Sequence, residues 1–209
     1  MNKNLAFLAI SAIAVVALVV ALGQKSEKTD VRVFLYWKDD PSLLDFKTID
    51  EFEKRGVKAI YLAGITEDLP GDPNYDKLAK FVEQTKSRGM ETIAMCMEDP
   101  LFIFDDESAL RSKLGSIIEA TGHLFDAYVT DIEPHTINDI YPDKFPNWHA
   151  SEENQSMYLV RYVEMSAILA DEAHSRGKLY ADTIPFWYHN KTKTLTPYAN
   201  GLDSYEADF

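Results

Sequence analysis

Two carboxylates stand two residues apart at the end of a strand-like run. The run is FDAYVTDIE at positions 125–133. Because side chains alternate in direction along a strand, Asp131 and Glu133 are expected on one face, in line with Ala127 and Val129. Two carboxyl groups so close raise each other's pKa, so that one can stay protonated near neutral pH. A protonated acid beside an ionised one is the arrangement that cleavage of a glycosidic bond requires.

Other predicted strand ends carry further acids and flat aromatic rings. Glu98 follows the third predicted strand. Asp182 lies near the end of the fifth, where it is either a third catalytic carboxylate or a capping acid. Sugar rings stack on flat aromatic side chains, so a floor of carboxylates with an aromatic rim suits a saccharide. The candidate rim residues follow predicted strands and are Tyr36, Trp37, Trp148, Trp187 and Tyr188.

Strand-like and helix-like stretches alternate along residues 31–209. Short β-rich runs predict strands at 31–37, 57–63, 90–97, 125–132 and 178–184. Helices are predicted at 48–55, 75–88, 106–121 and 154–176, and each is followed by a glycine, namely Gly56, Gly89, Gly122 and Gly177. A glycine in this place relieves the strain of a left-handed backbone conformation. The unit before Gly177 is longer than the others because of an insertion at 134–153.

This alternation predicts an α/β fold with a parallel sheet. An open doubly wound sheet and a closed barrel both fit the pattern. The first predicted strand is not followed by a glycine-rich phosphate loop, which favours the (β/α)8 TIM-barrel type. Eight such units usually take about 250 residues. We therefore expect an incomplete barrel of five or six units, in which the carboxyl ends of the strands carry the site.

The segment FDAYVTDIE resembles the fourth-strand signature of the chitinase-like glycoside hydrolases, Asp-Gly-x-Asp-x-Asp-x-Glu. Asp126 matches the first Asp of this pattern, Asp131 the third and Glu133 the catalytic Glu. Ala127 stands in place of the Gly, and Val129 in place of the middle Asp. The resemblance implies that Glu133 is a general acid and that Asp131 orients an acetamido group of the substrate.

Two further implications come from resemblance alone. A possible sixth strand at 201–207 contains Tyr205, near where the chitinase-like family places a tyrosine that contacts substrate. The pair Glu133-Pro134 is also similar to the Asn-Glu-Pro ending of the fourth strand in the large clan of retaining glycosidases, with Ile132 in place of the Asn. That second resemblance implies an acid/base role for Glu133 and a nucleophilic Glu on a seventh strand.

The first residues predict export. Residues 5–22 contain no charged side chain, and Lys3 precedes them. An apolar run of this length suits a spanning helix, and the small residues Ala21 and Gly23 suit a signal-peptidase site. We expect residues 1–23 to be a signal peptide or a membrane anchor, 24–30 a linker, and 31–209 a β/α-barrel-type glycosidase domain. The domain is then secreted or membrane-anchored outside the cytoplasm.

The charge balance limits the partners. The chain carries 34 acidic and 21 basic residues, for a net charge of −13. Nucleic-acid binding and adhesion to anionic lipid both need clustered Lys and Arg, so we expect no nucleic-acid partner and membrane contact only through the N-terminal segment. The expected partner is a poly- or oligosaccharide, with no cofactor and no metal. The alternatives are a non-catalytic glycan-binding module of the cell surface and, less favoured, a metal-dependent hydrolase that uses Asp131, Glu133 and His135.

Overall fold

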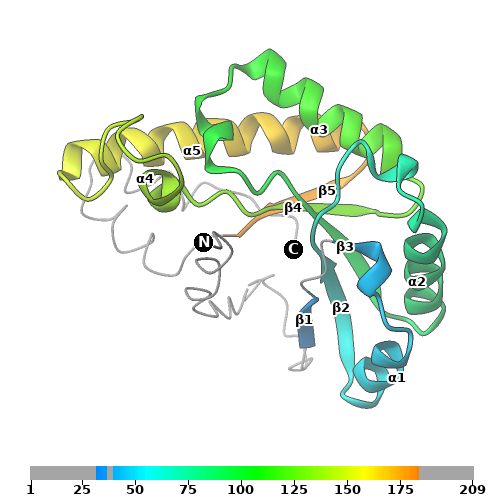
Figure 1. Cartoon of the computed structure of the whole chain (residues 1–209). Coiled ribbons are helices and arrows are strands. Elements are labelled where there is room, and N and C mark those ends of the chain that lie inside the picture. Colours follow the sequence, from blue (N-terminus) through cyan, green and yellow to red (C-terminus); the bar gives the residue numbers. More distant parts are fainter. Residues whose placement is uncertain (1–31, 37–39, 184–209) are drawn as a thin grey trace, which may run out of the picture.

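Five parallel strands form one sheet in the order β1-β2-β3-β4-β5 (Figure 1). The structure is a computed structural model, and it describes residues 32–36 and 40–183. The strands are β1 (Arg32–Tyr36), β2 (Val57–Leu62), β3 (Glu91–Cys96), β4 (Ala127–Thr130) and β5 (Leu179–Asp182). The predicted alternation and the α/β class are confirmed, although β4 is shorter at both ends than the predicted strand at 125–132.

Helices follow the strands and link each to the next. The α-helices are α1 (Lys47–Lys54), α2 (Tyr75–Ser87), α3 (Glu107–Thr121), α4 (Ile137–Ile140) and α5 (Glu152–Ser175). Short 3-10 helices are η1 (Pro41–Leu43), η2 (Leu69–Gly71), η3 (Pro100–Phe104) and η4 (Pro134–Thr136). Each long helix returns the chain to the start of the next parallel strand, as a parallel pairing demands.

The strand order favours one of the two architectures that the sequence left open. Every strand pairs with the strand that precedes it in the chain, and all four pairings are parallel. A doubly wound sheet reverses its strand order at a switch point. The described strands contain no such reversal, and their singly wound order is the one found in β/α barrels.

The two faces of the sheet are covered differently. The larger core joins side chains of α1, α2, α3 and α5 to one set of strand residues, which includes Ile60, Ala94 and Tyr128. The alternate strand residues face the other way and form a smaller cluster of Ala59, Ala63, Ile93, Met95, Ala127, Val129 and Ala181. We call these the helix face and the inner face. The helices lie along the outside of the curved sheet (Figure 1).

Three of the four predicted helix stops use a left-handed glycine. Gly56, Gly89 and Gly177 have φ angles of 70°, 75° and 70°. Gly122 differs, since its φ is −65°. A Cβ at Gly122 would lie 2.5 Å from the Ile118 carbonyl oxygen, so this position excludes a side chain because of crowding. Glycine is therefore required at the end of α3 by crowding, and not by the left-handed conformation that was predicted.

The insertion at 134–153 is anchored to the segment that follows β3. The Phe104 ring of η3 stacks on Phe145 with the ring centroids 4.6 Å apart. The Tyr141 hydroxyl donates to the Asp99 carboxylate at 2.9 Å. Within the insertion, the Asn138 side chain accepts a hydrogen bond from the Trp148 backbone N–H at 2.8 Å. The insertion is thus held beside the carboxyl ends of β3 and β4.

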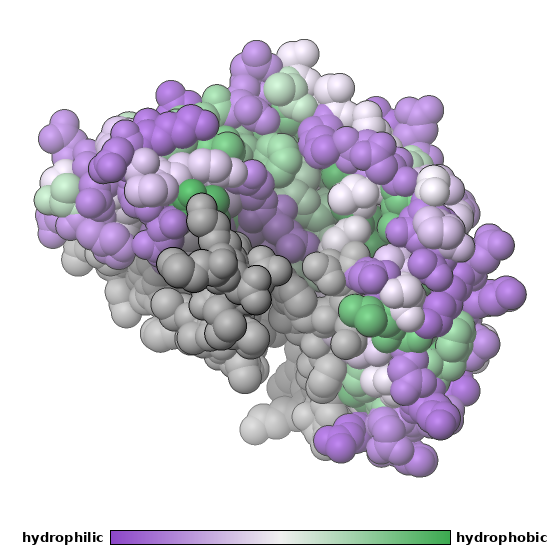
Figure 2. Space-filling model, in the orientation of Figure 1, coloured by the Kyte–Doolittle hydropathy of each residue, from purple (hydrophilic) through white to green (hydrophobic). Residues whose placement is uncertain are grey.

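Hydrophilic residues dominate the outer surface over the helices, with apolar side chains showing between them (Figure 2). This pattern matches helices that bury one stripe against a sheet and expose the other to water. Within residues 32–36 and 40–183, none of the helices is long and apolar enough to cross a membrane. The apolar run at 5–22 lies outside the described residues.

Candidate functional site

Asp131 and Glu133 follow β4 directly at the carboxyl end of the sheet. The predicted alternation holds within the strand, because Ala127 and Val129 belong to the inner-face cluster while Tyr128 packs on the helix face. Both acids are partly buried. The Glu133 carbonyl accepts hydrogen bonds from the backbone N–H of Thr136 at 2.9 Å and from its hydroxyl at 2.8 Å, which fixes the turn after the strand.

The environment raises the pKa of both carboxyl groups. For Asp131, burial raises the pKa most, a hydrogen bond with Thr183 lowers it, and the charge of Asp182 raises it further. For Glu133, burial again raises the pKa most, and the charge of Asp131 adds to it. With raised pKa values, both carboxyl groups hold a proton to a higher pH than solvated acids do.

Asp182 does not share the inner face with the pair. Its neighbour Ala181 belongs to the inner-face cluster, so Asp182 points toward the helix face. It is 7% exposed. The Tyr180 hydroxyl donates to its carboxylate at 2.6 Å, and the Thr130 hydroxyl donates to the same oxygen. Its predicted catalytic role is therefore corrected, because a group enclosed by Thr130 and Tyr180 under the helices is not presented to a ligand on the inner face.

Two predicted rim aromatics belong to the core. Tyr36 is 9% exposed, and its ring stacks on Phe81 with the centroids 5.7 Å apart. Trp148 is 1% exposed and packs against Tyr158 at 5.8 Å. Both rings are too enclosed to stack on a sugar, so their predicted role in substrate binding is corrected to one in packing.

Glu98 is held at the end of the neighbouring strand. It is partly buried, and its carboxylate accepts a hydrogen bond from the Gly64 backbone N–H at 3.2 Å. The preceding residue, Met97, has a left-handed φ of 52°, which residues other than glycine seldom adopt. This turn directs Glu98 toward the end of β2. Glu98 therefore stays a candidate for substrate binding at the carboxyl edge of the sheet.

His135 packs against the insertion. Its ring meets Trp148 edge-on at 6.3 Å, and burial lowers its pKa to about 4, so the imidazole is neutral at pH 7. Across the described ranges, 32–36 and 40–183, no three His, Cys, Asp or Glu side chains gather as a metal ion would need. The alternation of Asp131, Glu133 and His135 in sequence therefore does not become a ligand set in the fold.

One neighbour of the pair was missed from the sequence. Thr183 hydrogen-bonds with Asp131, and its hydroxyl also donates to the Thr130 carbonyl at 2.7 Å. It is two residues from Ala181, so strand alternation would have placed it on the inner face beside Asp131. Four of the predicted rim residues, Trp37, Trp187, Tyr188 and Tyr205, lie outside the described residues.

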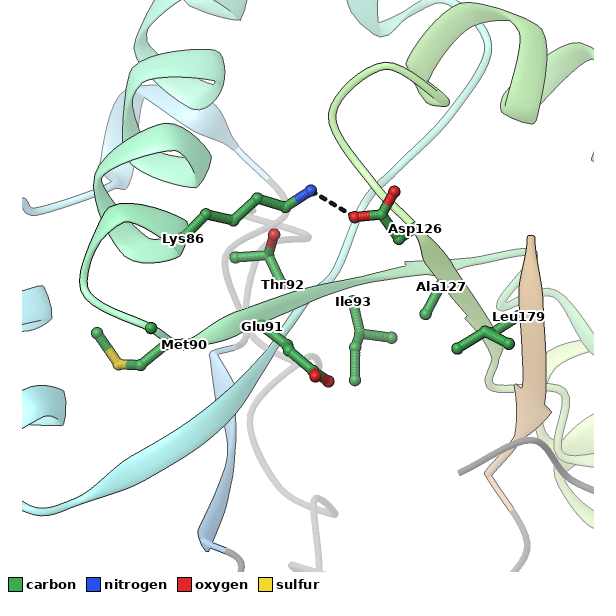
Figure 3. A pocket seen from close by; sticks show the side chains of 9 residues that line it. Lys86, Met90, Glu91, Thr92, Ile93, Asp126, Ala127 and Leu179 are labelled. Carbon is green, nitrogen blue, oxygen red and sulfur yellow. Dashed lines mark hydrogen bonds and ion pairs between the residues drawn. The ribbon is translucent and has the colours of Figure 1, made fainter. Parts of the chain in front are cut away.

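Two hollows flank the sheet at opposite ends. One, of about 380 Å³, lies at the amino ends of β3, β4 and β5, where Lys86 and Asp126 face each other in an ion pair of 2.8 Å (Figure 3). The other, of about 480 Å³, lies beyond the carboxyl end of β2 and is lined by Gly64 and Thr66 among others. The acidic pair shares the carboxyl edge with the second hollow. We place the site at this edge because Met97, with its left-handed φ, and Asp131 and Glu133, with raised pKa values, lie there.

The comparisons with known proteins are distant. No protein-family model matches the chain, and the search of curated proteins finds no match. Among solved structures, the virulence factor SghA in complex with its substrate analog salicin is 16% identical, with a TM-score of 0.42. The β-glucosidase from Thermotoga maritima in complex with cyclophellitol is 11% identical, with a TM-score of 0.43. A sugar phosphate isomerase/epimerase from Parabacteroides distasonis is 9% identical, with a TM-score of 0.45.

The matched regions are partial on both sides. They cover 65%, 65% and 78% of this chain, and 34%, 36% and 55% of the three solved chains, in the same order. This chain therefore spans about a third to just over half of the structures that it is similar to. Any chemistry at this site is therefore argued from the residues of this chain alone.

Proposed function

We propose that this domain is a glycoside hydrolase in which Glu133 is the general acid. The observation that carries the proposal is the pair of partly buried carboxyl groups at the carboxyl end of a parallel sheet, each with a raised pKa. Burial and the charge of Asp131 keep a proton on Glu133 at a pH where a solvated Glu would be ionised. A retained proton is what a leaving glycosidic oxygen needs.

The reaction uses the pair in a defined order. Glu133 donates its proton to the glycosidic oxygen as the bond from that oxygen to the anomeric carbon breaks, and the ionised Asp131 stabilises the positive charge that is left on the sugar ring. Water then adds to the anomeric carbon and loses a proton to the ionised Glu133, which restores the acid. Asp131 holds the substrate beside Glu133 and sets its pKa. Glu98, fixed by Gly64, contacts the same substrate from the neighbouring strand end.

The wider architecture follows from the same proposal. We propose that the five described strands are part of a (β/α)8-type barrel, which is supported by their singly wound order. We also propose that the domain acts outside the cytoplasm on a poly- or oligosaccharide, which is supported by the apolar run at 5–22 of the sequence. An acidic chain suits an uncharged or cationic glycan better than a polyanionic one.

The test is release of reducing ends from a panel of soluble polysaccharides by the purified full chain. We expect Glu133→Gln to lower kcat by a factor of about 10² or more, because it removes the proton donor and keeps the shape. Asp126→Asn is the matched control, since Asp126 is an exposed acid at the opposite end of β4 and its substitution leaves kcat unchanged. Wild-type levels of hydrolysis by Glu133→Gln refute the assignment.

The same panel separates the alternatives. Binding of a glycan by both the wild type and Glu133→Gln, with no hydrolysis by either, identifies a non-catalytic glycan-binding module. Activity that is lost on chelation and restored by one metal ion identifies a metal-dependent hydrolase. Either result removes the general-acid role of Glu133.

A further inference from the structure

The amino edge of the sheet carries a hollow that the proposed reaction does not use. β3 begins at Glu91, two residues before Ile93, and Ile93 pairs with Ala127, the first residue of β4. The amino end of β3 therefore extends past the start of β4, and the hollow of about 380 Å³ lies at this step (Figure 3). Pockets that bind small molecules measure about 300–1,000 Å³, so this hollow suits a small ligand.

Thr92 brings a buried hydroxyl to the lining of the hollow. The residue is 3% exposed, and its hydroxyl oxygen is buried without a hydrogen-bond partner among residues 32–36 and 40–183. Figure 3 shows this hydroxyl on the side of β3 where Lys86 and Asp126 face each other. A buried hydroxyl that makes no hydrogen bond costs free energy, so it is expected where a ligand supplies the partner.

An ion pair stands beside this hydroxyl. The Lys86 ammonium donates to the Asp126 carboxylate at 2.8 Å, and this hydrogen bond lowers the pKa of Asp126, so the pair is ionised at pH 7. Lys178 lies 3.8 Å from the same carboxylate. The bond to Asp126 uses one of the three N–H donors of Lys86. Lys86 can therefore donate to a ligand while Asp126 keeps it in place.

These charges select against a charged ligand. Asp126 and Glu91 repel a carboxylate, whereas Lys86 and Lys178 repel an ammonium group. An uncharged hydroxyl group meets neither penalty. It can accept a hydrogen bond from Lys86 and share a second one with Thr92, whose hydroxyl both donates and accepts.

Apolar side chains form the other wall of the hollow. Ile93 and Ala127 belong to the inner-face cluster, and Leu179 shares their face because it stands two residues before Ala181. Leu179 is 47% exposed, so part of this wall is open to a ligand. A sugar ring has two C–H faces and a rim of hydroxyls, so it can pack on such a wall and bond with polar groups at its edge.

We propose that this hollow is a second saccharide-binding site, which takes one uncharged sugar unit at the amino edge of the sheet. A C–H face of the sugar packs on Leu179, and one of its hydroxyls bonds with Thr92 and accepts from Lys86. The choice of a sugar among hydroxyl-bearing ligands rests on the proposed function. Because the hollow lies at the opposite end of β4 from Glu133, it adds affinity for a polysaccharide and leaves the rate of bond cleavage unchanged.

The test is an NMR titration of the nitrogen-15-labelled full chain with glucose, galactose and N-acetylglucosamine. We expect at least one of these neutral sugars to give saturable shifts of the backbone amides of Thr92, Ala127 and Leu179. Leu179→Ala raises the Kd about threefold or more, because the apolar wall is lost. Leu43→Ala makes the same change at another exposed leucine and leaves the Kd unchanged. Glucuronate and glucosamine, which add a negative or a positive charge to glucose, bind more weakly than glucose.

Thr92→Val separates a binding role from a structural one. Without sugar, this variant keeps or exceeds the wild-type Tm, because a hydroxyl without a partner is replaced by a methyl group of the same shape. Its Kd for the sugar rises about threefold to tenfold, as expected for the loss of one neutral hydrogen bond. Ser166→Ala removes another buried hydroxyl that has no partner among the described residues, and it leaves the Kd unchanged.

Three results overturn the proposal. One is the absence of saturable shifts at Thr92, Ala127 and Leu179 with all three neutral sugars. Another is tighter binding of glucuronate or glucosamine than of glucose. The third is a Thr92→Val variant with a lowered Tm or a wild-type Kd, since either shows that the hydroxyl serves the protein and not the sugar. If Thr92→Val does not fold, Leu179→Ala decides the question, because a wild-type Kd in that variant also refutes the site.

The second site and the proposed function fail separately in these experiments. A sugar that shifts only amides at the carboxyl edge, such as that of Glu133, rejects the second site and retains the proposed one. Shifts at the amino edge without hydrolysis of any polysaccharide retain the second site and reject the glycosidase.

Discussion

At the scale of single residues, the backbone decides which positions tolerate a side chain. Gly56 and Gly122 both follow helices, yet only Gly56 has a left-handed φ, and the space around it is open. At Gly122 the obstacle is the Ile118 carbonyl oxygen. The Gly122 carbonyl in addition accepts from the Lys178 ammonium at 2.6 Å, which ties the end of α3 to the start of β5.

We expect Gly122→Ala to lower the free energy of unfolding by about 2–3 kcal/mol, because the backbone must shift to admit the Cβ. Gly56→Ala meets no atom and costs about 1 kcal/mol through its left-handed conformation alone. Gly71→Ala, with open space and an ordinary φ, is the control and stays within about 0.5 kcal/mol of the wild type. Urea unfolding measures all three. An equal loss of unfolding free energy in Gly56→Ala and Gly122→Ala contradicts the crowding at Gly122.

At the scale of elements, α3 and α5 form the main helix–helix contact over the sheet. Leu114 of α3 and Leu169 of α5 are both fully buried in the larger core. On the surface of the same pair, Arg111 of α3 binds Asp171 of α5 at 2.8 Å. Exposed ion pairs of this kind add little to stability, so the apolar seam dominates the contact.

We expect Leu169→Ala to lower the free energy of unfolding by about 2–5 kcal/mol, through lost burial and a residual cavity. Leu43→Ala makes the same chemical change at a side chain that is 53% exposed, and it stays within about 0.5 kcal/mol of the wild type. Chemical denaturation followed by circular dichroism measures both. Similar losses in the two variants show that α5 does not pack as described.

At the scale of the whole molecule, stability depends on pH through one group whose pKa is lowered on folding and two groups whose pKa values are raised. Burial lowers the pKa of His135 from 6.5 to about 4, so the unfolded chain binds more protons than the folded one between these values. The contribution of His135 to the free energy of unfolding therefore falls as pH drops from about 6.5 to 4. Asp131 and Glu133, with raised pKa values, contribute stability at low pH that is lost as pH rises through their folded pKa.

We expect His135→Phe, which keeps a ring against Trp148, to lose less stability than the wild type on acidification from pH 6.5 to 4. The difference is about 1–2 kcal/mol, discounted for the partial solvent access of the ring. Thermal unfolding at half-unit pH steps measures the slopes. A His135→Phe slope equal to that of the wild type contradicts the burial of a neutral His135.

Local patterns in the sequence were enough to predict the elements and the alternation of side chains along β4. Glycines such as Gly89 punctuate the chain at the helix ends, and strand alternation placed Asp131 beyond Val129 on the inner face. The same parity, applied to β5, would have placed Asp182 on the helix face and Thr183 beside Asp131. Parity gives only the face of each residue, and their position next to β4 needed the β4–β5 register, a contact between strands about 50 positions apart.

The aromatic residues were harder to place from sequence. Tyr36 ends a strand. Its ring faces either the helices or a ligand, according to which face of the sheet the alternate residues of that strand take, and a strand of five residues does not settle this alone. Trp148 lies in an insertion without periodicity, so its burial follows from contacts with Tyr158 and His135 that only the tertiary structure provides. A flat ring near a strand end is therefore weak evidence for a sugar platform.

The singly wound strand order has a consequence for how the chain assembles. Each strand pairs with the strand that lies one helical connection away in the chain. The paired residues are therefore closer in sequence than in a sheet whose strand order reverses. Short sequence separation between contacts speeds folding, because less chain must be closed into a loop before the contact forms. During synthesis, β1 and β2 can therefore pair before β5 has left the ribosome. The part of the carboxyl edge that carries Asp131 and Thr183 forms later, when β5 joins β4.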